Sequence, residues 1–535
     1  MAKPSDPAAT SPKEALQSEA LDRLADCRQQ KRLSQIDIEE CYFFAAPRRL
    51  RSASSQSTET NRRKDESELQ TSIGYEVADD FMTMLIESFM PQSARWAERL
   101  AEPGTPAGIK TIVEEKAKAE DEKVFGMIRA SNFYAELGKQ GVPDAAIGVI
   151  ALDIRNKNTH SAVQCLSVPI RELEINIGPD GRIDDRFQVR KTKFRHLRGI
   201  LGKDISLPKE IEKKIATPED AKKPCEVRWG YWKLWDRDDD QYWQHVVMID
   251  DVVIHDELLK GAGSCGLVIG RFGSTPDFAW PDGPMIKALP ELRQHDEQRA
   301  GFVENVDFTL RPPFTYDDDG VISFEDGIEP GMAYPRRPGG GRETIQPIYE
   351  HQPLDAALFE EQKTEKRIRR LHYVDFPEQL GKTPPTLGQW LDEMVKAQKR
   401  IGTPGYTFWS EFPFEVFQRF KYLGEKRGAV KPIEVDGKQL NLTAYNPAQR
   451  AQDNQEVLTA TRVMQIAGSA FPQVFQAAVD PLETIGNIQR KLGDKLVVLH
   501  SKEDLQQAVK DLSQLGGVKG PNAPGGLVGS TQDAG

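Results

Sequence analysis

Two segments with helical patterns have centres that contain no apolar residue, and they bracket a stretch of strand and turn patterns. An Asp-Gly-Pro sequence at 282–284 is expected to open the first helix, because proline at the first helical position loses no hydrogen bond. The centre of this helix, 293–299, reads RQHDEQR. The second helix is expected to begin near Leu354, and its centre, 360–367, reads EEQKTEKR. A helix that is polar on all sides either bridges domains through solvent or is not stable alone.

The segment between these two helices, 307–349, is rich in glycine and proline and carries short strand patterns. The arrangement predicts a small β-rich module that two helical struts hold away from the main body. Such struts are most stable in an oligomer, where those of neighbouring copies support one another.

The rest of the chain combines helices and strands, which together with the struts makes the fold class α+β. Apolar spacing predicts a helix over 79–100 that is broken by Pro91 and a longer one over 109–137, and strand patterns begin at Leu166. Alternating aromatic and polar residues predict a β-hairpin over 226–254, with its turn at 237–240. From 411 onward the pattern is helical again.

Charge and composition exclude several classes of protein. The 535 residues carry 71 basic and 82 acidic side chains, for a net charge of −11. This argues against a protein that coats nucleic acid with a basic face, but it does not exclude one that handles DNA without gripping it. The five scattered cysteines form no CxxC pair, which indicates a reducing compartment without structural zinc. Because no apolar run reaches about 18 residues, we expect an intracellular protein that does not contact the membrane.

Two glycine motifs suggest ligand sites but have the wrong surroundings. The sequence 261–266 matches GxGxxG, yet an apolar strand pattern follows it where a phosphate-binding helix would have to begin. The acidic sequence 316–320 resembles a calcium loop, but the segments on either side of it do not have the helical patterns that such a loop requires. We interpret both as turns.

An acidic hairpin gives the alternative function. Residues 236–257 contain seven aspartates together with His245 and His255, a composition that a metal-dependent hydrolase could use. On a hairpin most of these side chains lie in turns that face water, and the aromatic residues favour core packing over base stacking. No HExxH, GxSxG or P-loop motif occurs in the chain. The sequence therefore nominates no catalytic residue, no metal ligand and no cofactor.

The end of the second strut is strongly basic. Cations at a helix C-terminus offset the helix dipole, which is sufficient to explain them. They are also the candidates for contact with DNA phosphates in an otherwise acidic protein. The candidate residues are Lys363, Lys366, Arg367, Arg369, Arg370 and His372.

Several segments resemble, in the same order, the head-to-tail connector (portal) proteins of short-tailed bacteriophages. The segment 269–293, IGRF followed by WPDGPMIKALPELR, is similar to the aromatic-Gly-x-Gly-Pro turn and the Ala-Leu-Pro-Asp-like helix start of that family. The sequence departs from the family at 282–283, and a Thr-Ala-Thr-Glu-Val-like helix is missing after the second strut. Similar elements lie at Tyr42–Pro47, Phe89–Pro91 with Trp96, Ser131–Tyr134, Val168–Ile170, Asp180–Asp184 with Arg190, Ile328–Gly331 and Tyr445–Arg450.

The resemblance implies a phage portal fold that forms rings, with a helical and β-rich wing, a two-helix stem, a small β-rich clip and a helical crown. The implied parts are a disordered or weakly ordered N-terminus (1–33), the wing (34–283), the first stem helix (284–304), the clip (305–350), the second stem helix (354–371), the channel (tunnel) loop region (372–400), the wing return and helical crown (401–515) and a disordered tail (516–535).

The resemblance also implies a structural function and no enzymatic one. Copies of the protein would form a ring, a dodecamer, at one unique vertex of the capsid, and the ring would be the channel for packaging and ejection of viral DNA. Twelve copies at −11 give the ring a charge of −132, which lets DNA slide because an acidic lumen repels phosphate.

The partners implied are further copies of the chain, the terminase packaging motor, the major capsid protein and scaffold, a tail adaptor protein and the double-stranded DNA in the channel. The location implied is the capsid portal vertex of the virion, and the host cytoplasm during assembly.

Overall fold

The computed structural model describes residues 12–50, 69–100, 107–156, 163–202, 205–236, 242–317, 332–336, 346–347, 355–375, 400–401, 404–435, 438–439, 441–444, 447–470 and 484–488. Residues 1–449 form one compact unit and residues 450–535 a second one. In the second unit the described structure is most of helix α14 (Pro447–Ala470) and a helical turn at 484–488. All other elements belong to the first unit.

A five-stranded antiparallel sheet is the largest sheet of the first unit, and its strands follow one another in chain order. They are β4 (Leu173–Ile177), β5 (Ile183–Lys193), β6 (Pro224–Lys233), β7 (Tyr242–Ile249) and β8 (Val252–Lys260). The pairing of β6 with β7, from Val227 opposite Ile249 to Lys233 opposite Trp243, confirms the predicted hairpin. Because successive side chains of a strand point to opposite faces, Tyr231 and Trp232 belong to different layers of the core.

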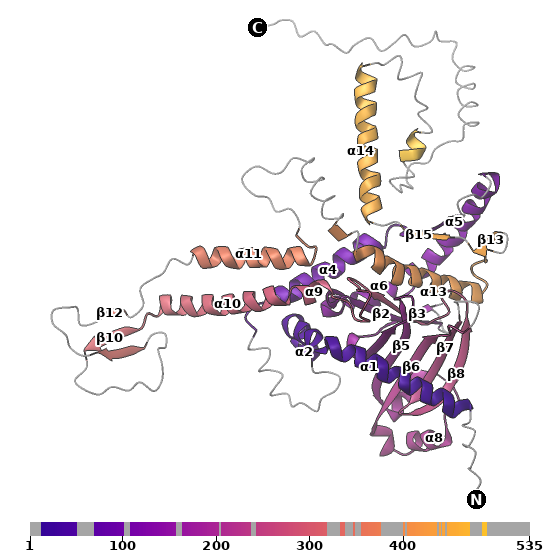
Figure 1. The fold of residues 1–535 in the computed structure, drawn as a ribbon, viewed down its shortest axis with the longest axis horizontal. Coiled ribbons are helices and arrows are strands. Elements are labelled where there is room, and N and C mark those ends of the chain that lie inside the picture. The colour runs from indigo at the N-terminus through magenta and orange to yellow at the C-terminus, as the bar shows by residue number, and fades with distance from the viewer. Residues whose placement is uncertain are drawn as a thin grey trace, which may run out of the picture. The chain divides into compact units, whose positions relative to one another are not determined.

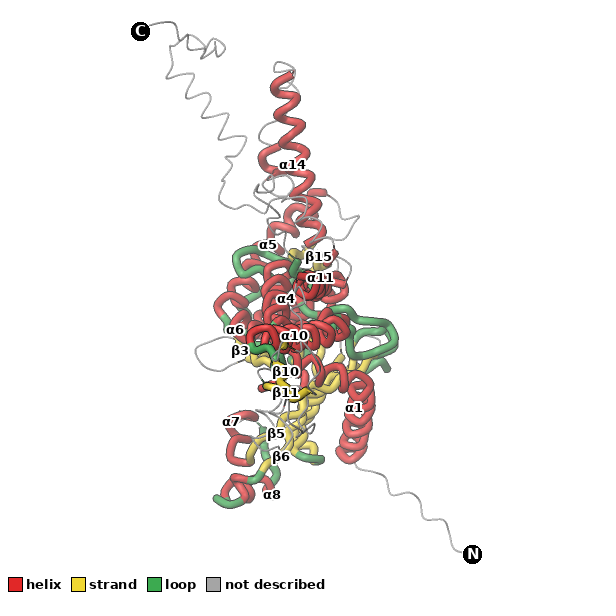
Figure 2. The backbone as a smooth tube through the Cα atoms, turned by 90° about the vertical axis from the view of Figure 1, so that its left-hand side faces the viewer, coloured by secondary structure: helices red, strands yellow, loops and turns green. Residues whose placement is uncertain are grey.

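A long N-terminal helix, α1 (Pro12–Ala45), covers one face of this sheet. Figure 2 shows α1 alongside the strands. Its residues Ala20, Leu24 and Cys27 are buried in the same apolar cluster as Phe187 and Trp232 of the sheet. The prediction that residues 1–33 are disordered or weakly ordered is therefore wrong for 12–33. Leu16, Ala20, Leu24 and Cys27 are spaced for one side of a helix, and packing of that side on the sheet stabilises α1.

A buried lysine on α1 fixes the helix to the start of the sheet. The Nζ of Lys31 donates to the carbonyl oxygens of Ile170 at 3.0 Å and Leu173 at 2.7 Å, and to the Glu174 carboxylate at 3.1 Å. The side chains of Lys31 and Glu174 are only 16% and 12% exposed. A cation at this depth is tolerated because each of its N–H groups has an acceptor.

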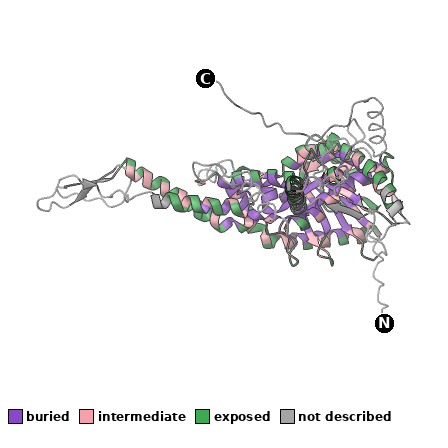
Figure 3. Cartoon of the chain, turned by 90° about the horizontal axis from the view of Figure 1, so that it is seen from above, coloured by how far each residue is buried: buried purple, intermediate pink, exposed green. Residues whose placement is uncertain are grey.

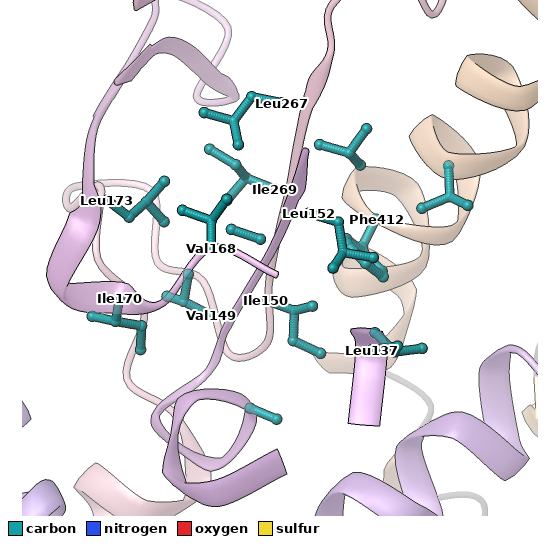
Figure 4. Close-up of a cluster of buried hydrophobic side chains, with 14 of the residues drawn as sticks. Leu137, Val149, Ile150, Leu152, Val168, Ile170, Leu173, Leu267, Ile269 and Phe412 are labelled. Carbon is teal, nitrogen blue, oxygen red and sulfur yellow. The ribbon is translucent and has the colours of Figure 1, made fainter. Parts of the chain in front are cut away.

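A second, three-stranded antiparallel sheet has the order β3 (Val163–Ser167), β2 (Val149–Asn156) and β9 (Leu267–Arg271). Strands β2 and β9 are buried on both faces, which explains why they are apolar throughout most of their length. Figure 4 shows Ile150 and Leu152 on the side of Phe412, with Val149 and Val168 on the other side. Strand β9 confirms the prediction that a strand follows the GxGxxG sequence.

Two ion pairs made by buried arginines attach helix α13 (Pro413–Lys426) and the residues before it to the sheets. The guanidinium of Arg186 makes a bidentate pair with Glu415, at 2.6 and 2.8 Å. Arg271 pairs with Glu411 and also donates to the carbonyl oxygen of Gly181 at 2.9 Å. Paired and hydrogen-bonded in this way, both arginines can lie in the core.

Both helical stretches predicted before residue 140 are interrupted in the structure, the first of them at Pro91 as predicted. The helix predicted over 79–100 is α4 (Ile73–Phe89), which stops before Pro91 because proline cannot continue a helix. Residues at its predicted end instead form β1 (Ala97–Leu100), which pairs with β15 (Asn441–Ala444). The helix predicted over 109–137 is divided into α5 (Ala107–Ala130) and α6 (Phe133–Gly138).

Strands also interrupt the C-terminal region for which the pattern predicts only helices. Besides β15, they are β13 (Glu434–Val435) and β14 (Lys438–Gln439). The prediction of an all-helical segment from 411 fails there because β15 is stabilised by a partner far away in the sequence. Shorter helices in the first unit include α2 (Pro47–Leu50), α7 (Leu197–Leu201) and α8 (Lys209–Ala216).

The two strut helices are present and lie side by side. The first is α9 (Pro284–Lys287) followed by α10 (Leu289–Leu310), and the second is α11 (Asp355–Leu371). Figure 1 shows α10 and α11 extending together from the sheets. Helix α10 continues beyond the predicted end at 304, so 305–310 is helical and not part of the β-rich clip. The helix ends at Leu310, because Pro312 and Pro313 follow and disfavour helical backbone in the residue before them.

The β-rich segment between the struts contains a three-stranded sheet of β11 (Ala333–Arg336), β10 (Phe314–Asp317) and β12 (Gln346–Pro347). Several predictions lie outside the described residues: 1–11, the hairpin turn 237–240, the end of the acidic sequence at 318–320, the turn 328–331, most of the channel loop (376–399) and the tail 516–535. None of the helices in the described ranges is long and apolar enough to cross a membrane.

Candidate functional site: the paired helices and their basic end

The helix pair starts against the backbone just before β2 of the three-stranded sheet. A Cβ atom on Gly283 would overlap the carbonyl oxygen of Ile147, so only glycine allows this approach of the two backbones. Pro284 then occupies the first position of α9. Met285 and Leu289 are buried, which anchors the base of the pair in the main core.

The contact between α10 and α11, called the seam below, is made by both apolar and polar side chains. Leu292 and His295 of α10 and Thr364 and Ile368 of α11 are buried. Burial lowers the pKa of His295, which keeps its imidazole neutral in this seam. The polar helix centres are thus not exposed on all sides, because each contributes one polar residue to the contact between the two helices.

Ion pairs between α10 and α11 lie at both ends of the seam. Arg299 of α10 pairs with Glu361 of α11 at 3.1 Å, and Arg367 of α11 pairs with Glu291 of α10 at 3.4 Å. These contacts fix the register of the antiparallel pair. Arg367, one of the six residues predicted to contact DNA, therefore has a partner within its own chain.

The other predicted DNA contacts are divided among different environments. Arg369 pairs with Glu365 at 2.9 Å and with Glu76 of α4 at 3.2 Å, so it attaches α11 to the body. Lys363 is exposed and pairs with Glu360 in its own helix at 3.2 Å. Lys366 and Arg370 are also exposed, and within the described part of the chain neither forms an ion pair.

His372 is wrongly grouped with the basic surface. It is fully buried, and its Nδ1 lies 2.9 Å from the carbonyl oxygen of Ile368. Burial lowers the pKa of His372 from its ordinary 6.5 to about 4, so the imidazole is neutral at pH 7. It cannot serve as a cation toward DNA. The sequence did not reveal this, because the position follows five basic residues and lies just after the helix end.

The partners of the basic residues were also missed by sequence reasoning. The Glu365–Arg369 contact has the i,i+4 spacing that a helix brings together, and this spacing could have identified it. Glu76 and Glu291 are far away in the sequence, and no local pattern indicates them. Three of the six candidates are thus explained by contacts within the chain: Lys363, Arg367 and Arg369.

The acidic hairpin does not assemble a metal site in its described residues. His245 stacks on Tyr231 with ring centroids 4.1 Å apart, and its Nδ1 lies 3.1 Å from the carbonyl oxygen of Gly230. Burial lowers the pKa of His245 to about 3. His255 lies 3.8 Å from Glu257. No three His, Cys, Asp or Glu side chains in the described ranges could hold a metal ion together.

A cavity of about 270 Å³ brings the hairpin and the GxGxxG turn together. His245, His255 and Ser264 line it, with Arg419 of α13. Arg419 is buried and donates to the carbonyl oxygens of Ile154 at 3.0 Å and Ser264 at 2.6 Å. This arginine holds the glycine turn against α13, which supports the interpretation of the motif as a structural turn.

Glycine at 263 has a steric explanation. Its φ of +78° is a conformation that other residues rarely adopt, and a Cβ atom there would overlap the backbone of Gln418. The second glycine of the GxGxxG sequence therefore serves close packing and not phosphate binding.

Comparison with known proteins identifies one family. The sequence model of the family described as "Bacteriophage head to tail connecting protein" matches residues 17–493. No relative was found among the curated proteins. Two solved structures are partly similar. The neck of an empty GTA particle computed with C6 symmetry has 11% identity over 80% of this chain and 91% of that chain, at a TM-score of 0.34. The virion of a native gene transfer agent (GTA) particle has 13% identity over 77% of this chain and 93% of that chain, at a TM-score of 0.32. Because both TM-scores are below 0.5, the family match alone carries the assignment.

Proposed function

The chain belongs to the family of bacteriophage head to tail connecting proteins, and we propose that its copies close into a ring of twelve around a channel for the viral DNA. The protein is a structural connector and a component of the virion. The finer parts of the proposal are the ring size, the channel and the position of the ring at a single capsid vertex.

The observation that carries the proposal is the extent of the family match. It runs from residue 17 to residue 493 and so includes the sheets, the helix pair and the β-rich segment between them. The charge of the chain supports it, since a ring of copies that each carry −11 repels phosphate and lets DNA slide. The exposed outer sides of α10 and α11 also support it, because copies standing side by side would cover them.

The proposed partners follow from the position of such a ring. The β-rich segment after α10, within 311–350 at the far end of the helix pair, would meet the packaging motor first and the tail adaptor later. The body would contact the major capsid protein and scaffold during assembly in the host cytoplasm. Hydrolysis of ATP would be the task of the motor. A role of the basic end of α11 in contacting DNA stays a prediction.

The experiment is to purify the full chain and examine it by negative-stain electron microscopy and native mass spectrometry. We expect rings with a central hole and a mass near twelve times 60.1 kDa. A chain that stays monomeric, both alone and with the capsid and scaffold proteins of its phage, would refute the proposal. Hydrolysis that depends on divalent cations and is lost in the His245→Ala/His255→Ala variant would instead establish the alternative enzyme.

A further inference from the structure

The side of α11 that faces away from α10 carries a row of cations. Lys363, Lys366 and Arg370 are spaced by three and four residues, so they lie on one side of the helix together with Phe359. All four are exposed, and Phe359 is 65% exposed although it is a large aromatic residue. In the described structure the only carboxylate that pairs with this row is Glu360 of the same helix.

Helix α10 carries an acidic row on its own outer side. Glu297, Glu304 and Asp307 are spaced by seven and three residues and lie on one side, with the small Ala300 between them. All are exposed, and none has an ion-pair partner among the described residues. Arg293, one turn earlier, does not neutralise this row because it is paired with Glu40 of α1. Figure 3 shows the exposed residues along α10.

The two rows cannot meet within one chain. The facing sides of α10 and α11 are occupied by the seam around His295 and Ile368, which is closed by the Arg299–Glu361 and Arg367–Glu291 pairs. The cations of one helix and the acids of the other are left on outward sides. Complementary surfaces that point in different directions on one molecule join copies head to tail, and such contacts generate rings when the rotation closes.

We propose that the basic row of α11 docks on the acidic row of α10 in the next copy of this chain. The inference rests on the proposed ring and names the surfaces that close it. The register follows from the ion pairs of the seam, which place Glu297 level with Lys363 along the helix axes. Sliding one helix pair along its neighbour by about 10 Å, roughly two turns at 1.5 Å per residue, brings Arg370 beside Glu297 and Lys363 beside Glu304. The helix pairs are therefore inclined to the ring axis.

Charge reversal tests the proposal on the full chain. One variant, K363E/K366E/R370E, makes both rows acidic, and a second, E297K/E304K/D307K, makes both rows basic. Each variant alone is expected to form no rings and to sediment as monomers or small oligomers. The reason is that the proposed contact between the two rows becomes repulsive at every interface of the ring. An equal mixture of the two is expected to restore rings that contain both variants in a 1:1 ratio, since each reversed row then meets its complement.

The matched control is K209E/K213E/K222E, which makes the same change in net charge at exposed lysines remote from the helix pair. It is expected to form rings like the original protein. Circular dichroism checks that each variant is folded, and native mass spectrometry reads the subunit composition of the mixed rings. Raising the salt concentration is expected to weaken the original rings more than the apolar contacts alone would predict.

Three outcomes would overturn the proposal. The first is that both reversed variants form rings, and the second is that the mixture fails to restore them although each variant is folded. The third is that K363E/K366E/R370E forms normal rings but changes the retention of DNA in assembled particles, which would assign the basic row to DNA. If the unmodified protein forms no ring under any condition, the proposed function fails first, and this result is distinct from the other three.

Discussion

Replacement of Lys31 by methionine tests whether tertiary contacts hold the N-terminal helix in place. Methionine keeps the apolar stem but removes the ammonium group, so the Glu174 carboxylate and the carbonyl oxygens of Ile170 and Leu173 lose their donor. Removing one member of a buried ion pair costs about 3–5 kcal/mol. Because the two side chains are 16% and 12% exposed, we expect about 3 kcal/mol, the lower end of that range.

The assay is hydrogen exchange of α1 measured by mass spectrometry, because it reports local opening without requiring the whole chain to unfold reversibly. A loss of about 3 kcal/mol corresponds to roughly a hundredfold faster exchange in α1 of the K31M variant. The matched control is R32M, which removes the neighbouring exposed cation and is expected to leave exchange unchanged. The double variant K31M/E174L is expected to recover most of the loss, since replacing both members of a buried pair by apolar residues is often neutral.

The dependence on pH gives a second test of the same contact. Burial already raises the pKa of Glu174, and removal of Lys31 raises it further. A carboxyl group whose pKa is raised in the folded state contributes stability at low pH that is lost as the pH rises through that pKa. The deficit of K31M is therefore expected to be smaller at acidic pH than at pH 8. Less than a tenfold change in exchange at pH 8, or a deficit that grows on acidification, would refute the reasoning.

Two further predictions concern the helix pair and its end. Gly283→Ala is expected to lower the melting temperature of the protein, because its Cβ would overlap the backbone at Ile147, whereas Gly301→Ala, at an open position inside α10, is expected to stabilise it by about 0.5–1 kcal/mol. Equal effects in calorimetry would contradict this contrast. For His372, whose pKa falls from 6.5 to about 4 on folding, the unfolded chain binds the proton more tightly, so stability is lost as the pH falls from 6.5 toward 4. The loss is about 3 kcal/mol at pH 4, and denaturation of H372N followed between pH 7 and pH 4 should show a correspondingly shallower slope.

The proposed contact between copies also gives the polar segments of the sequence a common explanation. Helices α10 and α11 present little apolar surface to each other, and their seam is closed by ion pairs. Contacts between charged, exposed side chains are individually weak, so such a pair gains from being repeated around a closed ring. The acidic and basic rows would then serve mainly to set the register between copies.

Some features of the sequence predicted structure reliably because the forces that produce them are local. The strand alternation of 226–254 predicted the pairing of β6 with β7, and the proline at 284 marked the start of the first strut. The interpretation of GxGxxG as a turn was correct because the apolar run after it is a buried strand. Pro91 ended a helix as predicted, whereas the predicted end of the first strut at 304 did not take account of Pro312.

By itself the sequence determined the α+β class, the two struts with a β-rich segment between them and the family to which the chain belongs. Only the tertiary structure decided that residues 12–33 form a helix, that β1 pairs with β15, and which cations stay unpaired. The physical reason is the distance along the chain between the partners. Periodicity and proline act over one or two turns and can be read locally. The burial of Lys31, the neutral state of His372 and the pairing of Arg369 with Glu76 depend on groups that folding alone brings together.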